Sequence, residues 1–571
     1  MKTLLAHMKK YMVESILAPV FKLVEALLDL LVPFIIAIII DNGVLKADKP
    51  YVIKYSIILV ALALLGLAFS VTAQFFAAKS AVGVSSSLRR SLFAKIQSLS
   101  YTELDKVGTA TLITRLTSDT QSVQSGINMA LRLFLRSPFI VIGAVVCSYL
   151  IDVKTGLIFT AGLVVLSTVV FILTKKTIPL YVKTQNNLDN VLSTTRESLS
   201  GIRVIRAYCN EKRIDEEFNR NNNLLNKIQI FSGKISAIMN PLTYLLINAV
   251  LIIMIYSNSI SVNSGILTQG QVIALYNFLA QILVELIKFA NLIITTSKGI
   301  AASKRVSDIL SIEDLDEDVQ SDILPEDGSV VFKGVSLSYF GSGAPSLSNI
   351  DLSVPSGTKV GVIGGTGSGK TSLVNLIPGF YKATTGDVIV GKHNVKEMSR
   401  KNLRDAVGIV PQHAQLFSGS IRDNIKKGNP DATDEEISDA LKFSRAYDIV
   451  EKKGGLDFVL SEGGSDLSGG QKQRLTIARA VVKKPKILIL DDSASALDFA
   501  TEKELRSEIN KLQDTTAFIV SQRISSVMHL DKIIVLDNGE ICGYGTHNEL
   551  LSGCPVYREI YESQIEMGAS A

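Results

Sequence analysis

The sequence is poor in cysteine and nearly balanced in charge. Four cysteines occur among the 571 residues, with neither a C-x-x-C pair nor a zinc-binding spacing: Cys147, Cys209, Cys542 and Cys554. We therefore expect reduced thiols on a cytoplasm-facing protein, and no disulfide framework. The formal net charge of +5 is small for this length, so nucleic-acid binding is not expected. The N-terminus lacks the charged, apolar and small-residue order of a cleaved signal, and none is expected.

Apolar residues are abundant instead, and they are concentrated in the first half of the chain. They make up 47% of the sequence, charged residues make up 20%, and the mean hydropathy is +0.30. This balance is typical of a membrane domain joined to a soluble one, and the length exceeds what one core can hold. We predict an all-α transmembrane domain in residues 1–310, an acidic linker in 311–327 and a soluble domain in 328–571.

Apolar runs of about 20 residues predict membrane-spanning helices, because lipid offers backbone groups no partner outside the helix. Six such helices are expected. The runs are 12–40, 55–78, a region centred on 137–151, 155–174, and two within 235–284, which carries no charge and breaks at "YSNSISVNSGILTQG".

The distribution of lysine and arginine predicts the orientation of these helices. Residues 79–136 hold eight Lys or Arg and residues 175–234 hold eleven, whereas the other loops hold only Lys46, Lys49, Lys54 and Lys154. Since positive charges stay on the cytoplasmic side, both termini are expected to be cytoplasmic. We predict that the two basic segments are helical and extend the membrane-spanning helices into the cytoplasm.

Charges inside the predicted spans have two possible meanings. Lys22, Glu25 and Asp29 share one helix face, and Glu285 pairs with Lys288 at i, i+3. They either line a substrate pathway or are paired structural charges near the cytoplasmic half or the lipid interface. Where the third span emerges, the sequence contains two further basic residues, which we expect to be interfacial anchors: Arg132 and Arg136.

The soluble half contains a phosphate-binding motif. In "KVGVIGGTGSGKTSLVNLI" an apolar strand leads into a glycine-rich loop and a helix, matching G-x-x-x-x-G-K-[ST]. Its backbone amides surround phosphates, Lys370 reaches the outer phosphates, and the Thr371 hydroxyl ligates magnesium. The predicted nucleotide-contacting residues are Gly364, Gly365, Thr366, Gly367, Ser368, Gly369, Lys370, Thr371 and Ser372. The soluble domain is therefore expected to have an α/β P-loop fold.

Two further motifs belong with this loop. "KILILDD" is an apolar strand that ends in Asp491, which is suitably placed to hold the magnesium shell. "LSGGQKQR" opens a predicted helix with two glycines after a serine, and forms a second phosphate-facing surface. Because the chain already has its own phosphate loop, this surface is explained if it covers nucleotide held by another chain.

Together these motifs resemble the nucleotide-binding domain of an ATP-binding cassette (ABC) protein, and six preceding spans resemble a bacterial half-transporter exporter. The resemblance implies that Tyr339 stacks on adenine and that Gln412 in "IVPQHAQLF" is the Q-loop glutamine, near the metal with Thr371 and Asp491. It implies a signature acting in trans from Leu467, Ser468, Gly469, Gly470 and Gln471, and a D-loop at 495–498. Coupling helices are implied in "YTELDKVGTATLITRL" and around "NEKRIDEEF".

Two positions depart from the family pattern. Where the family has a glutamate that polarises the attacking water, this chain has Asp492, one methylene shorter. Where the family has a switch histidine, this chain has Gln522, which can bond a phosphate but cannot carry an imidazolium charge. His529 follows seven residues later and is not expected to replace it.

The departures affect the chain's own hydrolytic site and leave the signature intact. We therefore expect one subunit of a heterodimeric bacterial multidrug exporter in the cell membrane, binding ATP and Mg²⁺ at a degenerate site and completing the site of a second half-transporter. A homodimeric exporter with slow hydrolysis and a nucleotide-gated protein that does not transport are the alternatives. The exported small molecule is not predicted by the sequence.

Overall fold

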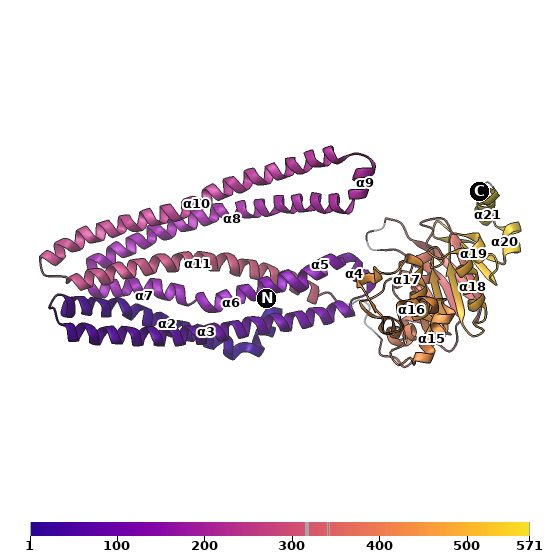
Figure 1. Ribbon diagram of the computed structural model, residues 1–571, viewed down its shortest axis with the longest axis horizontal. Helices are drawn as coiled ribbons and strands as arrows, with labels where there is room; N and C mark the ends of the chain where they lie inside the picture. Colours follow the sequence, from indigo (N-terminus) through magenta and orange to yellow (C-terminus); the bar gives the residue numbers. More distant parts are fainter. Residues whose placement is uncertain (1, 314–318, 340, 342, 570–571) are drawn as a thin grey trace. The chain divides into compact units, whose positions relative to one another are not determined.

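The computed structural model describes residues 2–313, 319–339, 341 and 343–569 (Figure 1). Its contacts divide the chain into two compact units. The first comprises Met1–Gln97 and Ala110–Ile312, and the second comprises Ser98–Thr109 and Glu313–Ala571. The short segment 98–109 thus belongs to the second unit, although it lies within the predicted transmembrane domain. Part of the predicted linker, 314–318, lies outside the described residues.

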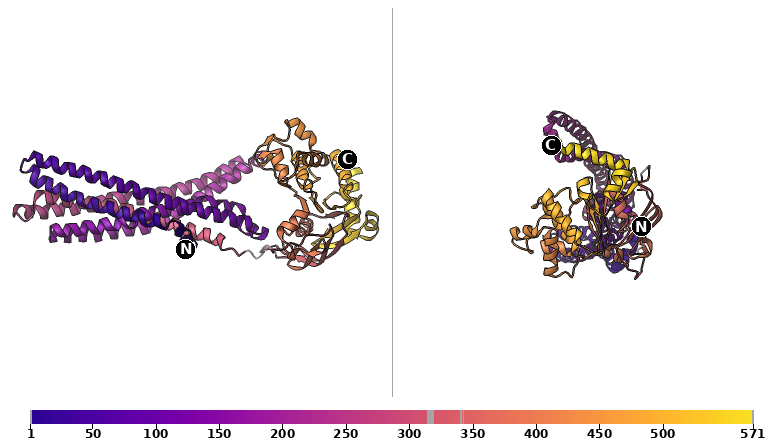
Figure 2. Two further views of the ribbon diagram at one scale, coloured as in Figure 1. Left: turned by 90° about the horizontal axis from the view of Figure 1, so that it is seen from below. Right: turned by 90° about the vertical axis from the view of Figure 1, so that its right-hand side faces the viewer.

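The first unit is a bundle of long helices (Figure 1, Figure 2). Among the described residues, six helical stretches are long and apolar enough to cross a membrane, as predicted: Leu4–Val44, Lys49–Ser98, Thr109–Ile151, Val153–Ser200, Glu211–Asn263 and Gln269–Leu310. The helices are α1 (Lys2–Met8), η1 (Lys9–Tyr11), α2 (Met12–Ile38), η2 (Ile39–Val44), α3 (Lys49–Ser98), α5 (Thr109–Thr114), η3 (Arg115–Asp119), α6 (Thr120–Leu133), α7 (Arg136–Ile151), α8 (Val153–Ser200), α9 (Ile202–Ala207), α10 (Glu211–Asn263) and α11 (Gln269–Leu310).

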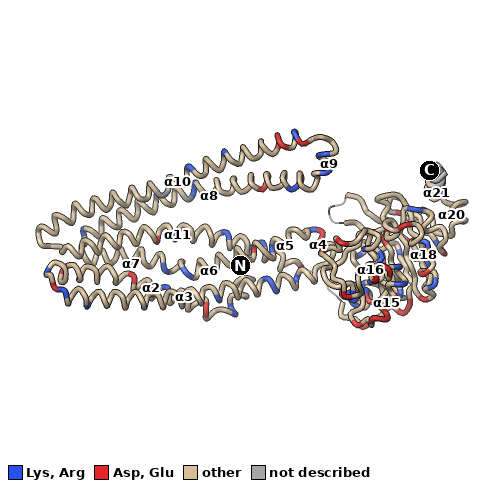
Figure 3. Tube along the Cα trace, viewed as in Figure 1, with Lys and Arg blue, Asp and Glu red and all other residues tan. Residues whose placement is uncertain are grey.

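The charge-free run 235–284 breaks inside the stretch that the sequence indicated. Helix α10 ends at Asn263, and α11 begins at Gln269 after Thr268, whose side-chain oxygen accepts from the backbone N–H of Gln271 at 3.3 Å. The Gln271 side chain in turn accepts from the N–H of Thr268 at 2.9 Å, which completes a capping box. Figure 3 shows the long uncharged stretches of α10 and α11 on either side of this break.

Helices α8 and α10 form a hairpin that separates from the other helices toward its closed end (Figure 1). The short helix at that end is α9, and "NEKRIDEEF" begins just after it and forms the first turns of α10. The structure therefore places the short connecting helix before "NEKRIDEEF" and not within it. Helix α9 has no buried residue, and Val204 is exposed.

The second unit contains two main sheets. One has four antiparallel strands in the order β2-β1-β4-β5, and the other has six strands in the order β12-β11-β3-β10-β9-β6, parallel except for β12. The strands are β1 (Val330–Leu337), β2 (Leu347–Val354), β3 (Lys359–Gly364), β4 (Thr385–Val390), β5 (His393–Asn394), β6 (Val407–Val410), β7 (Gly419–Ser420), β8 (Val459–Leu460), β9 (Ile487–Asp491), β10 (Thr516–Val520), β11 (Lys532–Asp537) and β12 (Glu540–Gly545).

Helices cover the six-stranded sheet, whose central strands β3, β9 and β10 are buried at every position. Such uninterrupted burial is typical of parallel strands packed on both faces. The helices of this unit are α4 (Tyr101–Val107), α12 (Lys370–Leu376), η4 (Val395–Glu397), α13 (Arg400–Ala406), α14 (Ile421–Lys426), α15 (Asp434–Phe443), α16 (Tyr447–Lys453), η5 (Glu462–Gly464), α17 (Gly469–Val481), α18 (Phe499–Asn510), α19 (Ile524–Val527), α20 (His547–Gly553) and α21 (Pro555–Ala569).

Helix α4 packs on the nucleotide-binding domain within the second unit. Its Tyr101 ring stacks on Phe380, with ring centroids 4.5 Å apart, and the guanidinium of Arg404 lies over both rings. Asp105 accepts a hydrogen bond from the Tyr381 hydroxyl at 2.7 Å, and this carboxylate together with burial raises the pKa of Tyr381. The first segment expected to contain a coupling helix therefore contacts the cassette through α4.

The prediction that Arg136 is an interfacial anchor is wrong. Its side chain is only 11% exposed and ion-pairs with Glu285 at 2.6 Å and Asp29 at 2.8 Å. The reason is local: α6 ends at Leu133 and α7 begins at Arg136, and Pro138 in the first turn of α7 cannot continue the preceding helix because it lacks an N–H. Arg136 thus enters the bundle at a helix break.

Candidate nucleotide-binding site

The glycine loop connects β3 to α12, at the carboxyl edge of the parallel sheet, where open α/β sheets bind ligands. Glycine is required at two of its turns. Gly367 has φ +82°, and Gly369 has φ +98°. A Cβ at Gly369 would also lie 2.7 Å from the backbone oxygen of Ser346. The loop backbone can therefore close around a phosphate only with glycine at these positions.

Lys370, the first residue of α12, turns back over this loop. Its Nζ donates to the carbonyl oxygens of Gly364 at 2.9 Å and Gly365 at 2.6 Å. Burial lowers the pKa of the Lys370 ammonium, while Asp492 and Asp491 oppose that change. The ammonium is thus held over the loop, where it can donate hydrogen bonds to phosphate oxygens.

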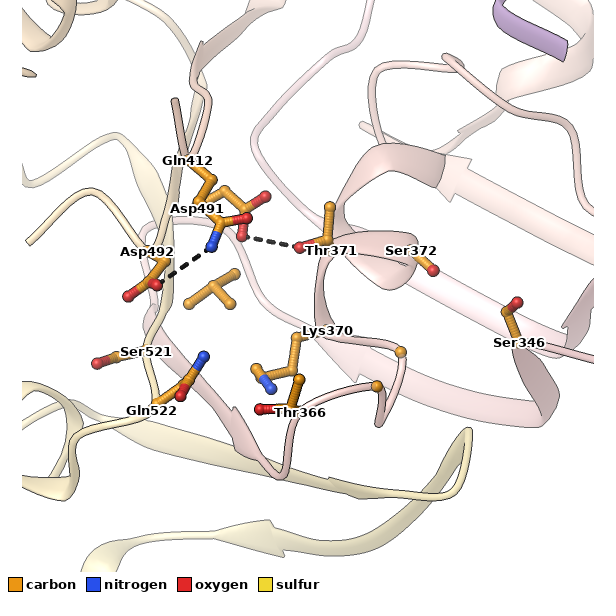
Figure 4. A pocket seen from close by; sticks show the side chains of 13 residues that line it. Ser346, Thr366, Lys370, Thr371, Ser372, Gln412, Asp491, Asp492, Ser521 and Gln522 are labelled. Atoms are coloured by element: carbon orange, nitrogen blue, oxygen red, sulfur yellow. Dashed lines mark hydrogen bonds between the residues drawn. The ribbon is translucent and has the colours of Figure 1, made fainter. Parts of the chain in front are cut away.

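Thr371 and Asp491 bring two oxygen ligands together. The Thr371 hydroxyl donates to Oδ1 of Asp491 at 3.1 Å, linking α12 to the end of β9 (Figure 4). Asp491 is buried, and burial raises the pKa of its carboxyl, with the charge of Asp492 adding to the increase. A hydroxyl beside a buried carboxylate is the hard-oxygen donor set that Mg²⁺ prefers, so these residues fit the predicted metal.

Asp492 follows directly and faces the same cavity. Its backbone has φ +46°, a left-handed conformation that aspartate tolerates better than most residues. Nε2 of Gln412 lies 3.5 Å from Oδ2 of Asp492, at the long limit of a hydrogen bond. Burial raises the pKa of the Asp492 carboxyl, and this Gln412 contact opposes the increase.

The switch position is held by the C-terminal helix. Gln522 is exposed toward the cavity, and its backbone carbonyl accepts from Nε2 of Gln564 at 2.8 Å. Oε1 of the same Gln564 accepts from the backbone N–H of Ile524 at 2.9 Å. His529 is exposed and does not line the cavity, as expected.

The cavity formed by these elements has a volume of about 350 Å³. In Figure 4 the side chains of Asp492 and Gln522 lie opposite Thr371. The predicted residues that line it are Thr366, Gly367, Gly369, Lys370, Thr371, Ser372, Gln412, Asp491, Asp492 and Gln522, and the lining residues that the sequence analysis missed are Ser346, Val520 and Ser521. Val520 and Ser521 could have been found as the last residue of the strand and the residue that follows it, just before the switch position. Ser346 lies in an ordinary turn and carries no motif.

Tyr339 lies beside this cavity without lining it. Its hydroxyl donates to the Ser372 hydroxyl oxygen at 3.1 Å, and its ring meets the edge of Tyr381, with centroids 4.9 Å apart. Tyr381 in turn donates to Asp105 of α4. The ring assigned to adenine is therefore in contact with a residue that binds α4.

The signature residues lie apart from the chain's own cavity, and none of them lines it. Ser468 caps α17: its N–H donates to Gln471 Oε1 at 2.9 Å, and its Oγ accepts from the Gln471 N–H at 3.4 Å. Ser468 and Gly469 are exposed, whereas Leu467 is buried. The start of α17 is therefore fixed by its cap, and Ser468 and Gly469 are exposed, so that another chain could contact them.

Comparison with known proteins gives the family. Residues 15–286 match the family described as ABC transporter transmembrane region, and residues 347–495 match the family described as ABC transporter. The uncharacterized ABC transporter ATP-binding protein YfiB of Bacillus subtilis is 34% identical over 567 residues, which are 99% of this chain and 98% of YfiB. The chain belongs to the ABC transporter family.

Two further comparisons agree with membership of the ABC transporter family. The ATP-dependent lipid A-core flippase of Syntrophus aciditrophicus is 31% identical, over 84% of this chain and 80% of the flippase. A solved structure of a bacterial Atm1-family ABC exporter with ATP bound matches with a TM-score of 0.80 at 22% identity, over 97% of this chain and 98% of that one. At that identity the likeness shows the fold alone. With one transmembrane region and one ATP-binding domain, this ABC transporter is an exporter half-transporter.

Proposed function

We propose that this half-transporter is the degenerate-site subunit of a heterodimeric exporter. One observation carries the proposal: Asp492 reaches only the long limit of contact with Gln412, 3.5 Å, while the signature at Ser468 is fully capped and exposed. A carboxylate one methylene short sits more than an ångström from where a glutamate would act, and a shift of about 1 Å can cost about a hundredfold in rate. The chain's own hydrolytic group is weakened, and the surface it offers a partner is intact.

The described residues have distinct roles in this proposal. The glycine loop and Lys370 hold the phosphates of ATP, and Tyr339 stacks on the adenine. Thr371, Asp491 and Gln412 would hold Mg²⁺, which neutralises phosphate charge when bound. Asp492 and Gln522 face the γ-phosphate without a good base or a cationic switch, so this ATP mainly holds the two cassettes together.

Transport follows from closure of the cassettes. Two chains would sandwich two nucleotides, each between one chain's glycine loop and the other chain's signature. Closure would pass through α4 and α9 to the spans and shift them from inward to outward facing, a two-state change that nucleotide biases. The chain would lie in a bacterial cell membrane with both termini cytoplasmic and with the domain boundaries expected from the sequence, and would export small molecules of the multidrug type.

The experiment compares the purified chain alone with the Asp492→Glu/Gln522→His variant, both in lipid nanodiscs. We expect the wild-type chain to bind ATP and hydrolyse it slowly, and the double variant to hydrolyse at least ten times faster. Adding the second subunit should restore fast hydrolysis to the wild type. A wild-type chain that alone hydrolyses as fast as the double variant would instead support the homodimeric exporter. Fast hydrolysis by the pair without movement of any solute into vesicles would support the nucleotide-gated alternative.

A further inference from the structure

A network of six charges lies inside the transmembrane bundle, where α2, α7 and α11 meet. Arg136 is its centre and contacts Glu285 at 2.6 Å, Asp29 at 2.8 Å and Glu25 at 3.7 Å. Lys22 pairs with Glu25 at 2.5 Å, and Lys288 pairs with Glu285 at 2.8 Å. Three acidic and three basic side chains therefore form one network of zero net charge.

The charges of the network lie at one level of the transmembrane bundle. Asp29 lies 16 residues before the loop at Leu45, Glu285 lies 16 residues after Gln269, and Arg136 lies 15 residues before Ile151. At 1.5 Å per residue, each is about 22–24 Å from the same end of the bundle. The three charges therefore share one level, and in a hydrocarbon core about 30 Å thick that level falls in the half farther from this end. This level is compatible with both readings that the sequence left open.

A cavity of about 340 Å³ opens beside this network. Four members of the network line it, but they are unequally exposed. The side chains of Arg136 and Glu285 are 11% and 4% exposed, whereas those of Asp29 and Lys288 are 40% and 42% exposed. The rest of the wall is mainly apolar, for example at Val32, Ile36, Ile140 and Val284. The cavity thus presents one carboxylate and one ammonium next to an apolar surface.

A proline leaves one backbone carbonyl of this wall to be satisfied by a side chain. Pro33 lies inside α2 and has no N–H, so the carbonyl of Asp29 four residues earlier loses its helical partner. Nε2 of Gln281 replaces it, donating to that carbonyl at 3.2 Å. The other end of the same amide, Oε1 of Gln281, is buried, lacks a hydrogen-bond partner and belongs to a residue of the cavity wall. Gln281 thus fixes the backbone at Asp29 in the cavity wall.

We propose that this cavity binds the head group of an exported amphiphile that carries a protonated primary amine beside an anionic group. The amine donates to the Asp29 carboxylate, whose backbone Gln281 holds, the anionic group faces Lys288, and the apolar wall contacts the hydrocarbon part. The network has no net charge, so binding of a zwitterion leaves the site neutral. A singly charged cargo would leave one uncompensated charge in the bundle. This inference rests on the proposed export function and adds its substrate class.

Two sources have this chemistry, an aminophospholipid of the bilayer and a free amphiphilic peptide. The test is calorimetric titration of the full-length chain in detergent, without nucleotide, with dioctanoylphosphatidylethanolamine, its mono-, di- and trimethylated analogues, and trileucine. We expect affinity to fall with each methyl group and to be at least tenfold weaker for the choline head group, which has no N–H to donate. Whichever of the ethanolamine lipid and the peptide binds with the higher affinity identifies the source.

Variants locate the site. Asp29→Asn, which keeps an oxygen for Arg136, and Gln281→Leu should each weaken binding of the ethanolamine lipid about tenfold. Tyr149→Phe, which removes a hydrogen bond to Thr160 outside the cavity, should leave it unchanged. If a variant does not fold, the methylation series on the wild-type chain decides.

Equal affinity for all head groups, binding of neither probe, or binding that folded Asp29→Asn and Gln281→Leu leave unchanged would each overturn the proposal. None of these results depends on hydrolysis, so they are distinct from failure of the degenerate-site assignment.

Discussion

Gln564 and Gln522 are 42 positions apart, yet Nε2 of Gln564 donates to the backbone carbonyl of Gln522 at 2.8 Å. The same amide accepts from the N–H of Ile524 at 2.9 Å. One side chain of α21 therefore holds the backbone at the position where the family has its switch histidine and again two residues later. The nucleotide site depends on the C-terminal helix as well as on the motifs that line it.

Gln564→Leu should loosen the switch segment while leaving the cassette folded. Two backbone groups lose their partners, each at a cost of about 1 kcal/mol, and Gln522 no longer keeps a fixed place beside the γ-phosphate. We expect affinity for ATP to fall by roughly threefold to tenfold, measured by nucleotide titration of the full-length chain. Gln513→Leu, at an exposed glutamine outside the cavity, is the matched control. Unchanged affinity in Gln564→Leu would show that the amide only anchors α21.

The two halves of the proposed asymmetry can be separated in the assembled transporter. Asp492→Asn should change total hydrolysis less than twofold if, as proposed, this carboxylate contributes little as a base. Ser468→Ala removes a helix cap and, in the proposed dimer, a group that faces the partner's nucleotide, and should lower hydrolysis by at least tenfold. Steady-state ATPase assays on the two variants provide the measurement. A large loss in Asp492→Asn with little effect of Ser468→Ala would reverse the assignment of the working site.

Asp491 gives a prediction about pH and stability. Burial raises the pKa of its carboxyl, so the protonated form is favoured in the folded protein. Its stabilising contribution is complete below the ordinary pKa, about 3.8, and is lost as pH rises through the raised value. At neutral pH the ionised carboxylate is therefore costly without a cation.

Asp491→Asn should then raise the Tm of the nucleotide-free chain at pH 7.5 by roughly 1–3 °C, with a smaller difference at pH 5, and should weaken Mg²⁺-dependent ATP binding. Differential scanning fluorimetry from pH 5 to 8 makes the comparison, with Asp439→Asn at an exposed aspartate as control. A lower Tm for Asp491→Asn at pH 7.5 would mean that its bond from Thr371 outweighs the cost of burial.

The sequence was most informative where a function is built from contiguous residues. The strand, glycine loop and helix from Lys359 to Leu376 form one segment, so the motif predicted both the element order and the cavity wall. It was least informative where partners are far apart. Arg136 meets Glu285 across 149 positions and Asp29 across 107, and nothing local distinguishes such a residue from an anchor at the lipid interface. Gln564 lies in a helix without any motif, for the same reason.

Tyr381 contacts the ring of Tyr339 and donates a hydrogen bond to Asp105 of α4. We predict that removing this hydrogen bond uncouples ATP hydrolysis from movement of the transmembrane helices. Tyr381→Phe keeps the ring against Tyr339 but removes the hydrogen bond to Asp105. We expect hydrolysis by the assembled transporter to stay within about twofold, since no group in the cavity changes. The ATP-driven change in distance between spin labels on the transmembrane helices should become smaller.

The matched control is Tyr544→Phe, which removes a hydroxyl that donates to the carbonyl of Ser353. It alters the same cassette without touching α4, and should leave both hydrolysis and the distance change as in the wild type. If Tyr381→Phe lowered both quantities in equal proportion, the hydroxyl would serve the nucleotide site itself. If it lowered neither, the stack of Tyr101 on Phe380 would suffice to hold α4, since that contact remains in the variant.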